Sequence, residues 1–197
     1  LSQVGRAAGF FRTVFYLPSI TPAVAVGVLW LWILNPRVGI VNQALGVFGI
    51  SGPGWTTDPN WIKPGIVLMS LWSVGGTVII FLAALRNVPP ELYEAARIDG
   101  ASGWQVFRHI TIPGIAPVLL LVSILTMTGY FQLFAEPYVM TEGGPLQSTL
   151  SVLYFMYEEG FKWWSLGRAS AVAFLLFVLM FLVTAFQLRL GRQRGDR

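Results

Sequence analysis

The polar side chains best suited to bind a solute lie inside long apolar runs and recur at helical spacing. An i, i+3, i+7 spacing places such residues on one face of a helix, and hydroxyl groups without charged neighbours suit a neutral, hydrogen-bonding solute. Two sets have this spacing and are predicted to line a solute path: Ser70, Ser73 and Thr77, joined by Gly76, and Ser123, Thr126 and Tyr130. Small and hydroxylated residues also mediate helix packing in membranes, which stays the alternative for any single member.

The residue types that catalysis needs are scarce. The chain has no Cys and a single His, His109, and it contains no H-E-x-x-H, G-x-S-x-G or G-x-x-x-x-G-K-[ST] motif. The apolar runs also lack the ionisable residues that proton-coupled transporters place at the membrane midplane. We therefore predict no catalytic residue, no metal site and no bound cofactor, so any ATP chemistry belongs to a partner chain.

The composition excludes a water-soluble protein. Of 197 residues, 55% are hydrophobic and 11% are charged, whereas soluble domains carry about a quarter of their residues charged. The mean hydropathy is +0.66. The net charge of +4 comes from basic residues beside apolar runs, so they are interpreted as topology signals in a membrane protein and not as a nucleic-acid surface.

Four uncharged stretches are long enough to cross a hydrocarbon core, which takes about 20 helical residues. They lack the alternation of membrane β-strands, so an all-α polytopic bundle is predicted, and Pro18 and Pro22 are expected to kink the first helix or delay its start. Two shorter segments, 38–57 and 145–157, are predicted to form a short interfacial helix with a loop and an amphipathic helix. The predicted spans are about 13–34, 64–86, 113–135 and 168–189.

The distribution of Lys and Arg predicts the orientation. Nine lie at the two ends of the chain, in the central loop (residues 87–112) or directly before it at Arg86, and four lie on the other side of the predicted spans. Because Lys and Arg are enriched on the inner side of a membrane, both termini and the central loop are predicted to be cytoplasmic.

The central loop is predicted to contain two short helices joined at an angle. Pro89 and Pro90 begin the first, and Gly100 ends it. Ser102 is expected to cap the second, which is predicted to stop before Pro113. Small residues between the helices leave a surface that another protein can approach closely. A purely structural scaffold would explain the spans but not this loop.

The central loop resembles the EAA loop of permease subunits in binding-protein-dependent ABC importers. The order and spacing of the matching residues carry the resemblance: Glu94, Ala95, Ala96, Asp99, Gly100, Ala101, Phe107, Ile110, Pro113 and Pro117. The resemblance implies that this loop docks on a cytoplasmic ATPase. Glu94 would then be the acidic contact, Gly100 the turn, and the three alanines a low docking surface, while Phe107 and Ile110 pack the second helix on the bundle.

A second segment is similar to the carbohydrate-uptake branch of that family. It is a T-x-G-G-P-x-x-x-T pattern from Thr141 to Thr149, although a plain helix-linking turn is the alternative. The resemblance implies a sugar permease, with glycerol-phosphate-like solutes as the alternative, in a bacterial or archaeal cytoplasmic membrane. It also implies a second permease subunit, expected to be a different chain, two ATPase subunits that bind the ATP, and an extracytoplasmic solute-binding protein. The chain matches the larger, C-terminal part of such a permease, so upstream helices are expected to be missing.

Overall fold

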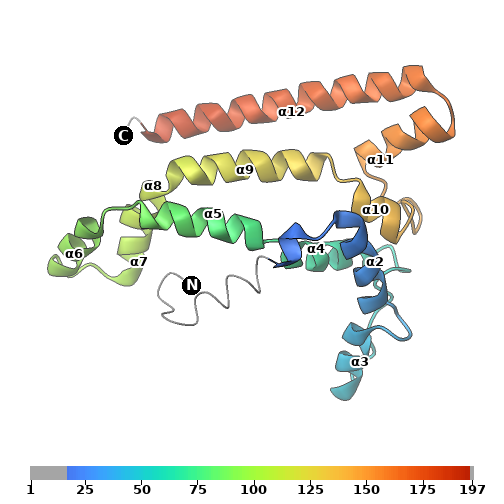
Figure 1. The fold of residues 1–197 in the computed structure, drawn as a ribbon, viewed down its shortest axis with the longest axis horizontal. Helices are drawn as coiled ribbons and strands as arrows, with labels where there is room; N and C mark the ends of the chain where they lie inside the picture. The colour runs from blue at the N-terminus through green and yellow to red at the C-terminus, as the bar shows by residue number, and fades with distance from the viewer. Residues whose placement is uncertain (1–16, 196–197) are drawn as a thin grey trace.

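The computed structural model describes residues 17–195, and no strand occurs among them. Three helices run side by side along the molecule: α5 (Gly75–Arg86), α9 (Ala116–Phe131) and α12 (Leu166–Gly195) (Figure 1). The central loop lies at one end of these helices. At the other end, α9 leads through α10 (Ala135–Met140) into a connection to α12, which we term the elbow (residues 141–165).

Shorter elements complete the fold. The elbow contains α11 and a π-helical turn, η3, and the central loop region contains α6, α7, a π-helical turn, η2, and α8. The bounds are η1 (a 3-10 helix, Leu17–Ile20), α2 (Ala23–Ile33), α3 (Ile40–Val47), α4 (Ile62–Trp72), α6 (Pro90–Ile98), α7 (Gly103–Val106), η2 (Phe107–Thr111), α8 (Ile112–Gly114), α11 (Val152–Tyr157) and η3 (Glu158–Lys162).

Length and composition identify the membrane-spanning candidates among the described residues. Two helices qualify, Ala116–Met140, which joins α9 to α10, and Leu166–Gly191. The bent pair α4 and α5 makes a third if it counts as one span, and α2 is apolar but has only 11 residues. Residues 13–16 of the first predicted span lie outside the described residues, so the number of four spans stays a prediction. As expected from Pro18 and Pro22, α2 begins only at Ala23.

The second predicted span is broken. The axes of α4 and α5 meet at 48°, and Ser73 and Val74 separate them. Consecutive glycines, Gly75 and Gly76, open α5, and glycine is a poor residue for a helix interior because it loses the most backbone freedom. A sequence scan for apolar length does not register such a break.

Two small clusters of buried side chains hold the helices together. One joins α2, α4 and α10 around Trp30, Leu34 and Met69, and the ring of Trp30 meets that of Trp72 edge-on, with centroids 6.1 Å apart. The second joins α5 to the start of α9 through Ala84, Val88 and Ile115. Most apolar side chains of α12 lie outside both clusters, which is the pattern expected of a helix that faces lipid or another chain.

Candidate functional site

The turn in the central loop depends on glycine. α6 ends in a Schellman arrangement, in which the Ala101 N–H donates to the Ala96 carbonyl (2.9 Å) and the Gly100 N–H donates to the Arg97 carbonyl (3.1 Å). This arrangement needs a left-handed residue, and Gly100 supplies it with φ +72°. The predicted end of the first helix at Gly100 is thus present in the structure.

The second helix of the central loop begins as predicted but ends differently. Ser102 and Gln105 form a capping box, because each side chain bonds the other residue's backbone N–H. The prediction that this helix stops before Pro113 is wrong, because the helix continues to Gly114. In the π turn η2, the Ile112 N–H donates to the Phe107 carbonyl, and this wider turn accommodates a proline that would clash in an α-helix.

The central loop is fixed to α5 and α9. Val88 is buried against Ile115, and a Cβ on Gly114 would lie 2.9 Å from a Val88 methyl group. The Tyr93 and Thr111 hydroxyls are 3.3 Å apart and link α6 to η2. Ile110 packs on the same cluster, as the resemblance implied.

The two helices of the loop expose a mixed apolar and acidic surface. Glu94 and Ala95 are exposed, but Ala96 is buried inside the loop and does not belong to the surface, contrary to the prediction. Phe107 likewise differs from its expected role, because it is exposed and lies beside Trp104, with ring centroids 5.7 Å apart. Ile98, the last residue of α6, is 87% exposed and joins this surface, although the sequence did not predict it there.

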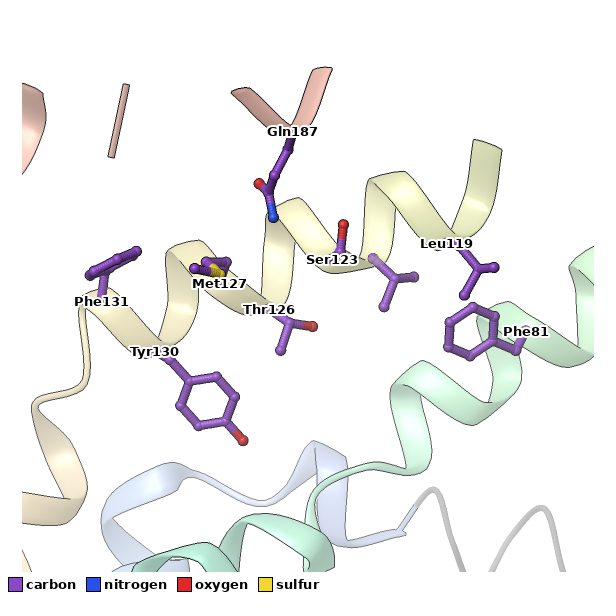
Figure 2. Close-up of a pocket in the computed structure, with 9 residues that line it drawn as sticks. Phe81, Leu119, Ser123, Thr126, Met127, Tyr130, Phe131 and Gln187 are labelled. Carbon is purple, nitrogen blue, oxygen red and sulfur yellow. The ribbon is translucent and has the colours of Figure 1, made fainter. Parts of the chain in front are cut away.

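A cavity of about 520 Å³, which we term the bundle hollow, lies between α5, α9 and α12. Figure 2 shows Thr126 and Tyr130 on one side of α9. The side chains of Phe81, from α5, and Gln187, from α12, point toward α9. The third-span stripe, Ser123, Thr126 and Tyr130, therefore lines one cavity. The full lining is Phe81, Leu119, Val122, Ser123, Thr126, Met127, Tyr130, Phe131 and Gln187.

The second-span stripe is not part of this lining. The break after α4 places Ser70 on one helix and Thr77 on the next, with Ser73 between them. The Ser70 hydroxyl donates to the Val67 carbonyl of its own helix (2.7 Å). A Cβ added to Gly76 would approach Ser19, at 3.8 Å, and not α9. An i, i+3, i+7 pattern places residues on one face only within one unbroken helix.

Gln187 is a polar lining residue that the sequence analysis missed. Its Oε1 atom is buried and has no hydrogen-bond partner, although the amide points toward α9 (Figure 2). A buried amide oxygen without a partner costs free energy, so this atom favours a hydrogen-bond donor in the hollow. The only signal in the sequence was a lone amide near the end of an apolar run.

The T-x-G-G-P-x-x-x-T pattern forms a turn that bonds to itself. The Thr141 and Thr149 hydroxyls lie 2.7 Å apart, and the Thr149 hydroxyl also donates to the Gly144 carbonyl (2.9 Å). The Thr149 backbone N–H donates to the Gly143 carbonyl (3.2 Å). Both threonines therefore serve to hold the turn closed.

This turn supports a cluster of aromatic rings in the elbow. Gly143, at φ +82°, lies so close to Tyr154 that a Cβ would be 2.9 Å from the ring. Around the buried Tyr154, the rings of Tyr138 and Tyr157 have centroids 5.5 Å apart, and Phe161 stacks on Tyr157 at 5.6 Å. Desolvation is the main cause that raises the pKa of Tyr154, and the Glu158 carboxylate acts in the same direction.

The rings and three charged groups surround a second cavity, the elbow hollow, of about 560 Å³. Lys162 donates to Glu158 Oε1 (2.9 Å), and this bond raises the pKa of Lys162. Behind the hollow, the buried Glu159 pairs with Arg168 at 3.1 Å and so joins η3 to α12. The lining is Tyr138, Val139, Glu142, Tyr154, Tyr157, Glu158, Phe161 and Lys162.

Solved structures share this arrangement of helices. The chain superimposes on the crystal structure of a bacterial alginate ABC transporter in complex with an alginate pentasaccharide-bound periplasmic protein. The TM-score is 0.87 at 25% sequence identity, over 98% of this chain and 68% of that chain. The overall fold is therefore that of an ABC importer membrane domain.

Sequence relatives agree with this fold. The chain is 36% identical over 195 residues to the lactose transport system permease protein LacF of Rhizobium radiobacter, and this covers 96% of the chain and 65% of the relative. It is 34% identical over 197 residues to the sn-glycerol-3-phosphate transport system permease protein UgpA of Agrobacterium fabrum, covering 98% of the chain and 66% of the relative. The chain thus spans just under two thirds of the length of these relatives.

The family follows from a match along nearly the whole chain. Residues 1–195 match the model of a family described as the binding-protein-dependent transport system inner membrane component. The match confirms the resemblance that the central loop carries. The chain is therefore a member of this family of transport-system membrane components.

Proposed function

We propose that this chain forms part of the membrane path of an ATP-driven sugar importer. One observation carries the proposal: the exposed central loop is fixed to α5 and α9, two of the three helices that line the bundle hollow. A force applied to the loop therefore acts directly on two walls of the hollow. Hydrolysis of ATP is assigned to a partner chain that docks on the loop at Glu94, Ala95, Asp99 and Gly100, with Ile98 added from the structure.

The chemistry of the bundle hollow favours a neutral solute. None of its nine lining residues is charged, and its polar groups are hydroxyls and one amide. Recognition of a phosphate in a membrane would require Arg or Lys to offset desolvation. The similarity to UgpA keeps sn-glycerol 3-phosphate as the alternative solute.

The proposed assembly contains a second permease, expected to be a different chain, two ATPase subunits and a solute-binding protein. The asymmetry of Lys and Arg supports a cytoplasmic central loop and an extracytoplasmic elbow, in a bacterial or archaeal inner membrane. The alginate transporter structure, which includes a periplasmic protein, supports a binding protein as a partner, and the proposed orientation would put that partner at the elbow end. Ser70, Ser73, Gly76 and Thr77 are left out of the proposed hollow but remain candidates for a surface shared with the second permease.

The proposal is tested by reconstituting the full-length permease with its partner chains in proteoliposomes. We expect ATP-dependent uptake of a neutral sugar, with lactose and arabinose oligosaccharides as first probes, and no uptake of sn-glycerol 3-phosphate. Uptake of the phosphate ester alone would replace the sugar assignment by its alternative. An assembled complex that hydrolyses ATP without moving any of these solutes would refute a role in uptake of this class.

Removing two hydroxyls of the stripe should weaken transport without disturbing assembly. In a Thr126→Ala, Tyr130→Ala double variant, two side-chain hydrogen bonds to solute are lost, at about 1 kcal/mol each, so the sugar concentration for half-maximal uptake should rise about thirtyfold. Co-purification of the ATPase should not change. Leu121→Ala with Leu125→Ala is the matched control, because both side chains are exposed on α9 outside the hollow. Equal effects of the two double variants on uptake would contradict a role of the stripe in solute binding.

A further inference from the structure

We propose that the elbow hollow is a second carbohydrate-binding subsite, which takes a neutral sugar unit before it reaches the bundle hollow. The inference rests on the proposed function, since it assumes a solute with sugar hydroxyls. Its own basis is the set of groups around the hollow, which includes no residue of the bundle stripe.

The walls combine the two kinds of group that a sugar ring needs. Apolar C–H faces of a sugar pack on aromatic rings, and hydroxyl groups bond to carboxylates and phenols. Tyr138 and Phe161 are 42% and 71% exposed, so their rings are available, and the cavity of about 560 Å³ is within the range of small-molecule sites. The Glu142 carboxylate adds an acceptor at the same hollow.

The rings are held in place before any ligand arrives. Tyr154 is buried beneath them, with the Gly143 backbone against its ring, and the self-bonded turn fixes Gly143. Glu142 adopts φ +49°, a left-handed conformation that is unusual for glutamate and that the adjacent turn maintains. A preformed wall lowers the entropy cost of binding, which is a property of binding sites more than of plain helix connections.

Charge and position define the ligand class. The lining holds Glu142 and Glu158 against Lys162, a net charge of −2 + 1 = −1, so an anionic solute is disfavoured. Residues near the two hollows also follow closely in the sequence. Phe131 lines the bundle hollow, and the ring of Phe134, three residues later, lies 5.2 Å from Tyr138 and 5.3 Å from Tyr157.

The experiment measures lactose and arabinotriose binding to the assembled full-length transporter in nanodiscs, without binding protein and without ATP. The Thr126→Ala, Tyr130→Ala background removes two of the three stripe hydroxyls and so weakens binding in the bundle hollow, which raises the share of the saturation-transfer NMR signal that comes from the elbow. Adding Phe161→Ala should weaken this binding at least about fivefold, since one aromatic wall is lost. Trp164→Ala is the control, because Trp164 is 79% exposed on the same elbow but outside the hollow.

A charge variant gives an independent readout. Glu142→Gln keeps the shape but removes the carboxylate, so it should lower sugar affinity about threefold and increase binding of sn-glycerol 3-phosphate relative to sugar. Binding-protein affinity, measured on the same nanodiscs, should change in neither elbow variant.

Three results would overturn the subsite. The first is that no sugar binds in the Thr126→Ala, Tyr130→Ala background. The second is that Phe161→Ala and Trp164→Ala lower sugar affinity equally. The third is that an elbow variant loses affinity for the binding protein while its sugar binding stays intact. The third result would identify a docking surface for the binding protein. Failure of the proposed function looks different, because it would abolish ATP-driven uptake by the unaltered transporter, whereas the elbow is measured at equilibrium without ATP.

Discussion

Glu94→Lys is expected to abolish uptake by preventing the ATPase from docking. Glu94 is exposed on α6, and none of the ion pairs found among residues 17–195 involves it, so its charge is available to a partner. Truncating one member of a hydrogen-bonded charge pair at an interface costs about 2 to 5 kcal/mol, and a reversed charge adds repulsion. Co-purification of the ATPase should therefore fall at least about thirtyfold, with uptake falling in parallel.

A neighbouring acidic residue supplies the control. Glu91→Lys makes the same change of charge one helical turn earlier, where only the favourable interaction of an acid with the start of α6 is lost, about 0.3 to 1 kcal/mol. It should retain most of the ATPase, and Glu94→Gln should fall between the two lysine variants. Equal losses in both lysine variants would show that docking responds to bulk charge and not to Glu94. Normal co-purification of the ATPase with the Glu94→Lys variant would contradict a role of Glu94 in docking the ATPase.

Gly143→Ala is expected to disrupt the elbow. An L-residue at φ +82° costs about 1 to 2 kcal/mol, and the new methyl group would lie 2.9 Å from the Tyr154 ring. Together these effects should destabilise the elbow by about 2 to 3 kcal/mol, which increases the population of opened elbow about thirtyfold or more. Trypsin cleavage after the exposed Lys162 should accelerate by the same factor in the assembled transporter, and sugar binding at the elbow should fall.

The matched control is Gly167→Ala. Gly167 lies in the first turn of α12, and an added Cβ would meet no atom within 4 Å, so cleavage after Lys162 should stay at the rate of the unaltered chain. If Gly143→Ala left cleavage and sugar binding unchanged, the turn would not be what holds the aromatic rings. Intact ATPase co-purification in this variant would place the defect in the elbow and not in assembly.

Local signals in the sequence predicted the central loop well. Pro90, Gly100 and Ser102 each impose a backbone condition on their own position, so the start of α6, its left-handed end and the cap of α7 could be placed without tertiary information. The end of the second helix could not, because the helix continues past Pro113 only through the π turn η2, Phe107–Thr111, directly upstream.

Features that depend on distant contacts were harder to predict. Ser70 and Thr77 share a helical period in the sequence, but the break at Ser73 places them on two helices. Gln187 could not be predicted as a lining residue, because it lines the same hollow as Thr126 and Ser123 only through the packing of α12 on α9. The elbow hollow likewise required α10, α11 and η3 to converge, and no spacing rule joins Tyr138 to Phe161.

The attachment of the central loop has a consequence for how the passage can open. Val88, which follows α5, packs against Ile115 and Gly114 just before α9, so we expect these two helix ends to move together. Under the proposed function, a force on the loop would then move α5 and α9 together, without changing their position relative to each other. Under the proposed function we expect the path to widen or narrow by displacement against α12, and the separation of Gln187 from Thr126 in a spin-label distance measurement would report this change.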